Sequence, residues 1–455
     1  MQLLEIARKT VEQAARKGAS QAEATVVVTD SALTRFTKNA IHQNVAQRKY
    51  NLNLDVVVDG NKRGSTAINS FDDADIAESL DSVLKIAKVS NPDPDFVSLP
   101  EPREIAPLPE IYNKRTAEVM PEERVDGVQS LIDAALDHDK RVRWSTGAYT
   151  TENCTYAIAN SLGIEAETAY TRASVDIVVK AGDGEDGSGY SAKYSRDVGD
   201  FDFEAMARSA AEDAVNSIGP ELIPTGEYEA VFMPATVSTF TGFMGRLGFS
   251  ARAYQDGYSC LTDKIGSQIF DEKLSVTDVG RSLETFNVMP FDGEGVPKGT
   301  LRLINKGVPE NLCYDSYTAL KDGVESTGHA LPKSGGFFFR GMPLPLNMVV
   351  EPGDATVDEM IEDTKKGVYI TRLHYVNAIR RDLAVISGLT RDACWLIEDG
   401  EVKHPIKVMR FTDSIIKVMS GIDAIGENST VEMLPSGTLP AIKVSSFRFT
   451  GQSEF

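Results

Sequence analysis

Leu54-Asp55-Val56-Val57-Val58 has a close counterpart later in the chain, Val175-Asp176-Ile177-Val178-Val179. Both stretches are rich in β-branched residues, which favour strands. Each is followed by a glycine-containing turn and a Gly-Ser pair, and then by a Phe-Asp pair that precedes a segment of helical spacing. The repeated order predicts two copies of one α+β unit, each a meander sheet covered by helices. Chance similarity between two segments of the same class is the alternative.

The segments around the two stretches follow the same order. In the first unit we expect helices over residues 3–17 and 72–87, with strands at 22–29, 33–37, 44–49, 51–58 and 64–69. In the second unit we expect helices over 121–137 and 203–217, with strands at 141–151, 155–160, 164–169, 174–180 and 189–195.

A proline-rich stretch separates the two units. Residues 91–111 contain six prolines, which exclude a helix or an interior strand and predict an extended connector. We therefore divide the chain into a first unit at 1–90, a connector at 91–118, a central unit at 119–219 and a β-rich C-terminal domain at 220–455. In the last domain we expect a helix over 356–366 and strands at 227–233, 301–305, 337–340, 347–351, 394–398 and 439–449.

Composition limits the classes of function. The chain has 455 residues and a net charge of −20, so direct binding to nucleic acid or to an anionic membrane is not expected. Its four cysteines are widely spaced and form no Cys-x-x-Cys pair, which argues against a disulfide scaffold or a zinc ribbon. Residues 1–17 carry charges throughout, unlike a signal peptide, and no apolar stretch is long enough to span a membrane. These features predict a cytoplasmic protein.

Several motifs in the C-terminal domain resemble the TldD/PmbA family, whose older label is modulator of DNA gyrase. The matching stretches are Met289–Pro297 (MPFDGEGVP), Ser326–Ala330 (STGHA), Thr262–Ile269 (TDKIGSQI), Trp395–Val402 (WLIEDGEV) followed by Pro405, and Ala424–Asn428 (AIGEN). Their order and spacing are similar to those of the TldE/PmbA branch, and the arrangement of two paired units before a third domain agrees with the family.

The resemblance implies a pair of related subunits. TldD-type subunits resemble zinc metallopeptidases, with a His-Glu-x-x-x-His helix and a Cys ligand near the C-terminus. TldE/PmbA-type subunits lack these ligands and associate with a TldD-type subunit, and the pair is implicated in cleaving unfolded peptides. Aligned on these motifs, the helix motif falls at about Gly242–Leu247 and the Cys segment at Asn428–Gly437, and neither contains a ligand. We therefore expect no metal and no catalytic residue in this chain, and zinc in its partner.

Candidate contacts for a peptide or a partner subunit lie in one matching motif and one aromatic run. Ser326, Thr327, Gly328 and His329 form the first, and Arg340 ends the run Gly335-Gly-Phe-Phe-Phe-Arg. A hydrogen-bonded loop histidine and a core strand are the respective structural alternatives. The expected state is a heterodimer with a TldD-type metallopeptidase subunit, or a homodimer when the chain is alone, acting on unfolded peptide.

Two rival functions remain open at this stage. The chain could be a stand-alone homodimeric peptide-binding protein, or a hydrolase of changed, non-zinc chemistry. For the hydrolase, Cys260 or Cys313 would serve as a nucleophile paired with His329 or His374.

Two carboxylates are a further candidate for the hydrolase. Asp292 and Glu294 flank Gly293 in the Phe-Asp-Gly-Glu-Gly stretch and could form a cation or acid–base site. A structural turn is the alternative for this pair, because the glycines suit unusual backbone angles.

Overall fold

The structure, a computed structural model, describes residues 2–184, 186–332, 342–433 and 436–452. The α-helices are α1 Leu3–Arg16, α2 Asp73–Val89, α3 Lys114–Ala117, α4 Pro121–His138, α5 Phe203–Asn216, α6 Pro234–Leu247, α7 Ala251–Gln255, α8 Ser316–Asp322, α9 Val357–Glu362 and α10 Ile415–Met419. The strands of the N-terminal half are β1 Gln21–Thr37, β2 Ala40–Val58, β3 Lys62–Ile68, β4 Val142–Asn160, β5 Glu165–Ala181 and β6 Gly187–Ser195.

The remaining strands belong to the C-terminal domain. They are β7 Gly226–Phe232, β8 Val276–Val279, β9 Thr300–Asn305, β10 Val308–Pro309, β11 Met348–Val350, β12 Lys366–Ile370, β13 Arg372–Arg380, β14 Val385–Arg391, β15 Trp395–Glu398, β16 Glu401–Pro405, β17 Met409–Ser414, β18 Ile422–Met433 and β19 Ser436–Gln452. Short 3-10 helices occur at η1 Pro109–Ile111, η2 Val198–Asp200 and η3 Arg381–Leu383.

The two predicted units share one sheet. In the described residues its strand order is β3-β2-β1-β4-β5-β6, so each unit is a three-stranded meander and the two first strands pair with each other. The β1–β4 pairing is antiparallel and runs from Glu23↔Asn160 to Phe36↔Gly147. The repeated stretches of the sequence fall on β2 and β5, which occupy equivalent places on the two sides of this central pair.

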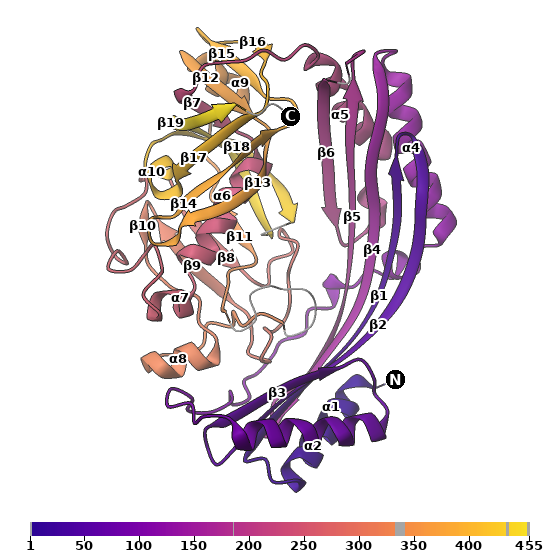
Figure 1. Cartoon of the computed structure of the whole chain (residues 1–455), viewed down its shortest axis with the longest axis vertical. Coiled ribbons are helices and arrows are strands. Elements are labelled where there is room, and N and C mark those ends of the chain that lie inside the picture. Colours follow the sequence, from indigo (N-terminus) through magenta and orange to yellow (C-terminus); the bar gives the residue numbers. More distant parts are fainter. Residues whose placement is uncertain (1, 185, 333–341, 434–435, 453–455) are drawn as a thin grey trace.

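One face of this sheet carries the helices (Figure 1). Helices α1 and α2 pack near one end, against alternate residues such as Val26 and Leu54, and α4 and α5 pack near the other end, against residues such as Val175 and Ile177. The opposite face is turned toward the C-terminal domain, and there Tyr156 packs against Phe291. Asp55 and Asp176, the acidic residues of the repeat, lie on this second face.

The C-terminal domain is built around a larger mixed sheet. Within the described residues it has thirteen strands, and its central part runs β8-β11-β19-β7-β12. Helix α6 packs on β19 and contributes Val237 and Phe240 to a core in which Phe447 contacts several other phenylalanine rings. The α+β class and the β-rich C-terminal region are therefore confirmed.

The strands of the first unit are longer than predicted. Residues 22–29 and 33–37 belong to the single strand β1, and 44–49 and 51–58 belong to β2, because the residues between them, such as Asp30 and Tyr50, are also paired across the hairpin. The predicted helix at 356–366 is shorter and ends at Glu362, since β12 starts at Lys366. The predicted strand at 337–340 lies outside the described residues.

Residues 90–108 form neither helix nor strand, as their proline content predicts. The short helices η1 and α3 then follow. The domain limits at residues 90, 118 and 219 stay a prediction. Among the described residues, no helix combines the length and apolar character needed to cross a membrane.

Candidate functional site

The predicted contact residues 326–329 form a tight loop around the backbone of Tyr314. The hydroxyls of Ser326 and Thr327 both donate to the carbonyl oxygen of Tyr314, at 3.3 and 3.2 Å. The backbone N–H of Tyr314 donates in turn to Thr327 Oγ1 at 2.8 Å. Gly328 has a φ of 71°, and a Cβ there would lie 2.5 Å from the carbonyl oxygen of Pro297. The loop therefore needs glycine at this position.

His329 is buried below this loop and faces a buried carboxylate. The imidazole is 2% exposed, and its Nδ1 lies 2.8 Å from the carbonyl oxygen of Thr327. Its Nε2 lies 3.4 Å from Oδ1 of Asp278, which is fully buried. The other carboxylate oxygen of Asp278 accepts the backbone N–H of Asn347 at 2.8 Å. Burial raises the pKa of Asp278 and is the largest single cause, but His329, the Lys298 charge and the Asn347 N–H together outweigh it, so the pKa is lowered overall.

The structure separates the two carboxylates of the Phe-Asp-Gly-Glu-Gly stretch. Asp292 points into the protein and accepts three backbone N–H groups, from Glu294, Val296 and Ala330. Burial raises its pKa, the Glu294 charge adds to this, and the three N–H donors oppose it. A Cβ at Gly293 would lie 2.2 Å from the carbonyl oxygen of Leu331, so glycine allows the two segments to touch. Asp292 therefore holds the turn against the 326–331 segment.

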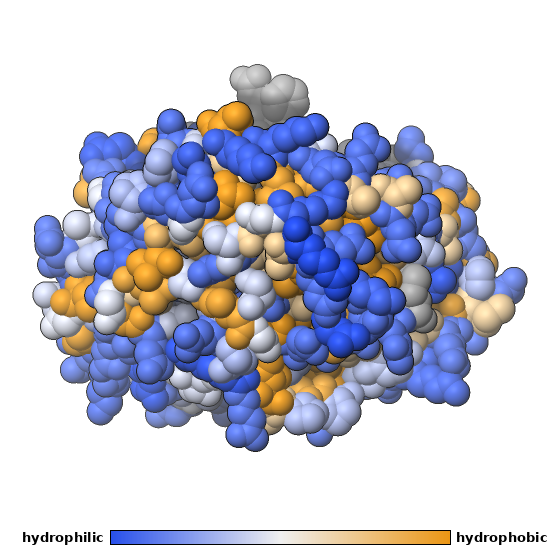
Figure 2. All heavy atoms as spheres, turned by 90° about the horizontal axis from the view of Figure 1, so that it is seen from below, coloured by the Kyte–Doolittle hydropathy of each residue, from blue (hydrophilic) through white to orange (hydrophobic). Residues whose placement is uncertain are grey.

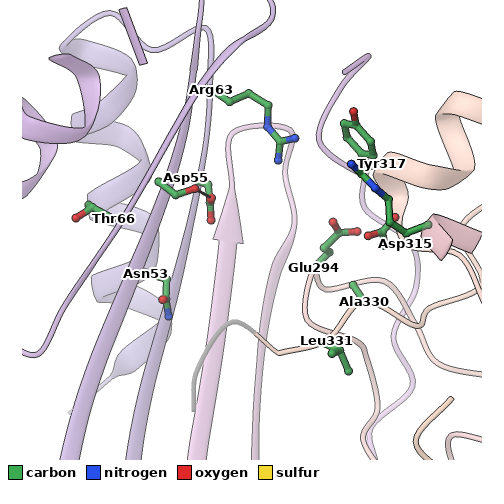
Figure 3. A pocket seen from close by; sticks show the side chains of 11 residues that line it. Asn53, Asp55, Arg63, Thr66, Glu294, Asp315, Tyr317, Ala330 and Leu331 are labelled. Carbon is green, nitrogen blue, oxygen red and sulfur yellow. Dashed lines mark hydrogen bonds between the residues drawn. The ribbon is translucent and has the colours of Figure 1, made fainter. Parts of the chain in front are cut away.

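Glu294 points the other way, into a cavity of about 290 Å³ between the first unit and the C-terminal domain. Figure 3 shows Asp55 of β2 and Arg63 of β3 on one side, with Glu294, Asp315 and Tyr317 on the other. Ala330 and Leu331, which directly follow the loop, complete the wall. We call this space the Asp55–Glu294 cavity. The outer surface of this end of the molecule is mainly hydrophilic, with apolar areas between charged side chains (Figure 2).

Sequence reasoning did not identify Asp55, Arg63, Asp278 or Tyr317 as site residues. One signal was present for the first of them: Asp55 is an acidic residue in an otherwise apolar strand, and Asp176 stands at the same place in the repeat. Burial raises the pKa of Asp176 to about 6. The other residues carried no comparable signal. Arg340 lies outside the described residues, and the role of 326–329 in contacting a peptide or partner stays a prediction.

The segment where zinc ligands are expected in TldD-type subunits is part of helix α6. Gly242 and Leu247 occupy the two histidine positions, and Leu247 is 2% exposed in the core. Phe243 occupies the glutamate position, and the Arg246 guanidinium lies over its ring at 4.5 Å. Neither glycine, leucine nor phenylalanine offers a donor atom for zinc. The side chains of this segment do not fit the metal, and no group of three or more His, Cys, Asp or Glu among the described residues is placed to hold one.

The cysteines are poor nucleophiles in this structure. Cys260 and Cys313 are both fully buried, and burial raises the pKa of Cys260 to about 12 and that of Cys313 well above its ordinary value. The Nδ1 of His329 contacts Thr327, and its Nε2 faces Asp278 at 3.4 Å. Among the described residues, neither sulfur is hydrogen-bonded to a histidine, so a thiolate would lack the base that activates such nucleophiles.

Substituting Cys260 or Cys313 with alanine is expected to leave peptide cleavage by a reconstituted complex within about twofold of the unsubstituted level. A buried, protonated thiol cannot supply a nucleophile, so the substitutions remove only packing. Initial rates on an unfolded peptide, compared at equal folded concentrations, measure this. A loss of more than about tenfold for either variant would restore the hydrolase of changed chemistry.

Comparisons with known proteins match most of the chain to one family. The family described as the PmbA/TldA metallopeptidase C-terminal domain matches residues 225–451, and its central domain matches residues 114–218. A metalloprotease of Methanothermobacter thermautotrophicus is 28% identical over 294 residues, which span 62% of each chain. Metalloprotease PmbA of Escherichia coli O157:H7 is 23% identical over 393 residues, covering 85% of this chain and 83% of that protein.

Solved structures of similar fold cover nearly the whole chain. TldE from Thermococcus kodakarensis superposes with a TM-score of 0.87 at 20% identity, over 98% of this chain and 100% of that chain. A Thermotoga maritima protein named as a modulator of DNA gyrase also gives 0.87, at 22% identity, over 98% and 99%. The family matches together with the shared fold identify this chain as a member of the PmbA/TldD family of metallopeptidases and their relatives.

Proposed function

We propose that this chain is a non-catalytic TldE/PmbA-type subunit of a zinc metallopeptidase complex that degrades or processes unfolded peptides. Its partner is a TldD-type subunit, which supplies the zinc and the activated water. The present chain contributes structure and peptide contacts, and it forms a homodimer when its partner is absent. The complex acts in the cytoplasm.

One observation carries this proposal: the side chains of α6 at the expected zinc position. A hydrolytic zinc site needs about three protein ligands and an open position for water. Gly242 and Leu247 stand where the two histidines are expected, and Phe243 stands where the general base is expected. Leu247 packs in the same core as Phe240 and Met244, so a ligand could not replace it without disturbing that core. At the expected zinc position, α6 therefore contributes to core packing and offers no metal ligands.

A second observation agrees with a role in handling peptide. The sheet face that is turned toward the C-terminal domain is rich in polar side chains, unlike the apolar face beneath the helices. The Asp55–Glu294 cavity lies at one end of this interface. A second, open hollow of about 670 Å³ lies between the central unit and the C-terminal domain and includes Ser188 and Asp392. Hollows of this size can hold a few side chains of an extended peptide and are too small to hold a folded domain.

The proposal is tested with the purified chain, a purified TldD-type subunit, and an equimolar mixture. We expect the chain alone to bind less than about a tenth of an equivalent of zinc and to cleave no peptide, because its α6 lacks donors. The mixture should form a heterodimer that contains zinc and cleaves a fluorogenic unfolded peptide. Size-exclusion chromatography, metal analysis and cleavage rates are the measurements. Stoichiometric zinc with cleavage in the chain alone would overturn the proposal.

The same experiment separates the stand-alone peptide-binding protein from the complex. A protein of that kind would remain a homodimer in the mixture and would leave the partner's zinc content and cleavage rate unchanged. The hydrolase of changed chemistry is addressed by the two cysteine variants and by Asp292→Asn. That substitution keeps an acceptor for some of the backbone N–H groups and removes the charge.

A further inference from the structure

We propose that a groove on the helix-covered face of the six-stranded sheet binds a small organic acid through its carboxylate, with Arg124 as the principal contact. The groove has a volume of about 410 Å³ and lies between the two helix pairs, over the middle of β1, β2 and β4 (Figure 1). We call it the Arg124 groove. It belongs to the sheet face opposite the Asp55–Glu294 cavity, so the inference goes beyond the proposed handling of peptide.

The alternation of side chains along the strands places the groove on this face. Asp30 and Ala32 of β1 line the groove, and they point to the same side of the strand as Val26 and Phe36, which pack beneath the helices. Arg48 of β2, which also lines it, is paired with Asp30 across the hairpin. The groove is therefore the part of the face that the two helix pairs leave open.

Arg124, near the start of α4, is a buried guanidinium that lines this groove. It is 2% exposed. Its Nη1 donates to the carbonyl oxygen of Val119 at 3.2 Å, its Nη2 donates to Asn44 Oδ1 at 3.4 Å, and its Nε has no hydrogen-bond partner. Both acceptors are neutral, and no ion pair among the described residues includes this guanidinium.

A buried arginine without a carboxylate is unusual, because the hydration that the charge loses is normally offset by an opposite charge. Burial is the largest influence on the pKa of Arg124 and lowers it. The side chain has more N–H donors than the two that Val119 and Asn44 use, so donors remain for a ligand. A carboxylate would supply both the missing charge and a pair of acceptors that match the planar guanidinium.

The other charges in the lining compensate each other. Arg48 Nε and Nη2 donate to the two carboxylate oxygens of Asp30 at 2.6 and 2.7 Å. The lining thus contains two guanidiniums and one carboxylate, which leaves one positive charge, that of Arg124. This balance suits a singly charged anion better than a phosphate dianion, whose second charge would have no partner.

The N-terminus of α4 adds to the positive potential. This helix has 18 residues, no side chain caps its N-terminus, and Pro121 of its first turn lines the groove. The N-terminal end of a long helix carries a partial positive charge and attracts anions. Glu122 and Glu123 of the same turn are exposed and do not line the groove.

The remaining wall selects the body of the ligand. Ala32, Ala46, Ala117 and Val119 give it an apolar surface, and Thr151 of β4 adds a hydroxyl. Small-molecule sites usually combine an apolar wall with a few polar groups that fix the orientation of the ligand. The groove therefore matches a monocarboxylate with a small apolar body, such as an aromatic acid.

The test compares benzoate with benzamide, which has the same shape and no charge, and with inorganic phosphate. Dissociation constants for the purified chain are measured by ligand-observed NMR at low ionic strength. Because hydrogen bonds between charged groups are the stronger kind, we expect benzoate to bind about tenfold more tightly than benzamide. Phosphate should bind more weakly than benzoate.

Arg124→Met should make benzoate and benzamide bind equally, because it removes the charge and keeps a side chain of similar length. The matched control is Arg208→Met, which removes an exposed guanidinium from α5 and should keep the tenfold preference. Thermal unfolding establishes that each variant is folded.

Asp30→Asn provides a second, opposite test that does not alter the buried arginine. It removes the carboxylate from the lining and frees the charge of Arg48, so benzoate should bind about threefold more tightly while benzamide is unaffected. This variant serves if Arg124→Met does not fold.

Equal binding of benzoate and benzamide by the unsubstituted chain would overturn the inference, as would tighter binding of phosphate. A benzoate preference that survives in Arg124→Met, that disappears in Arg208→Met, or that does not increase in Asp30→Asn would also overturn it. No TldD-type partner and no peptide is present in these measurements. Their outcome is therefore independent of the partner assay.

Discussion

Replacing Asp278 with alanine is expected to lower the free energy of unfolding by about 3 kcal/mol, the effect of leaving buried polar groups without a partner. Asp278 is 0% exposed and lies under the 326–331 segment, 3.4 Å from Nε2 of His329. Its loss leaves the imidazole without its carboxylate and the backbone N–H of Asn347 without its acceptor. Both are buried groups, so water cannot replace the lost contacts easily.

Urea denaturation at pH 7 measures this loss. Asp278→Asn should cost less than Asp278→Ala, because an amide oxygen can still accept the Asn347 N–H. Asp137→Ala, at an exposed position of α4, is the control and should change stability by less than about 0.5 kcal/mol. A cost for Asp278→Ala as small as that of the control would mean that the pair does not hold the loop.

The pH dependence of Asp278 follows from its lowered pKa. A carboxyl whose pKa is lower in the folded state adds stability that is fully present above its unfolded pKa, near 4, and is lost in more acidic solution. The contribution of Asp278 should therefore be constant at neutral pH. Stability changes between pH 5 and 8 must come from other groups.

The fold was more accessible to sequence reasoning than the site. The repeated Leu-Asp-Val-Val-Val pattern identifies β2 and β5 correctly, because runs of β-branched residues favour strands. The pairing of β1 with β4 was not predicted, since it joins residues such as Glu23 and Asn160 that are far apart in the chain. Local patterns carry no information about which edges of two similar units meet.

The site was only partly accessible for a related reason. The motif around His329 was found by resemblance, but its partner Asp278 belongs to a short strand with no distinctive pattern. Asp292 and Glu294 looked like one site because only one glycine, Gly293, separates them in the sequence. The turn at Gly293 and Gly295 sends the two carboxylates to opposite sides, one to backbone N–H groups and one to the cavity. Direction of a side chain at a glycine turn depends on backbone angles that the sequence does not specify.

Glu432→Gln is expected to stabilise the protein by about 2 kcal/mol at pH 8, and by less than about 1 kcal/mol at pH 5.5. Glu432 lies near the end of β18, close enough to Tyr190 and Tyr194 of β6 for its charge to act on both phenols. Burial raises its pKa from 4.5 to about 7. The side chain is partly exposed, so the effect on stability is smaller than the full shift would give.

The sign follows from the protons bound in each state. Between pH 4.5 and 7 the folded protein keeps a proton on Glu432 that the unfolded chain has lost, so stability falls as pH rises through this range. Glutamine imitates the neutral form at every pH and removes this dependence. Urea denaturation of both proteins at several pH values measures the difference. Glu110→Gln, which changes an exposed glutamate, corrects for the general effect of the −20 net charge.

A constant difference between Glu432→Gln and the unsubstituted protein across pH 5.5 to 8 would contradict this account. The place of Glu432 in the chain also relates its raised pKa to metal binding. Glu432 lies in the 428–437 segment, where the family resemblance expects the cysteine ligand of catalytic subunits. A carboxyl that is protonated near neutral pH is a poor ligand for a metal, because zinc binds the deprotonated form. Burial at this position therefore works against metal binding for the same physical reason that it makes the stability depend on pH.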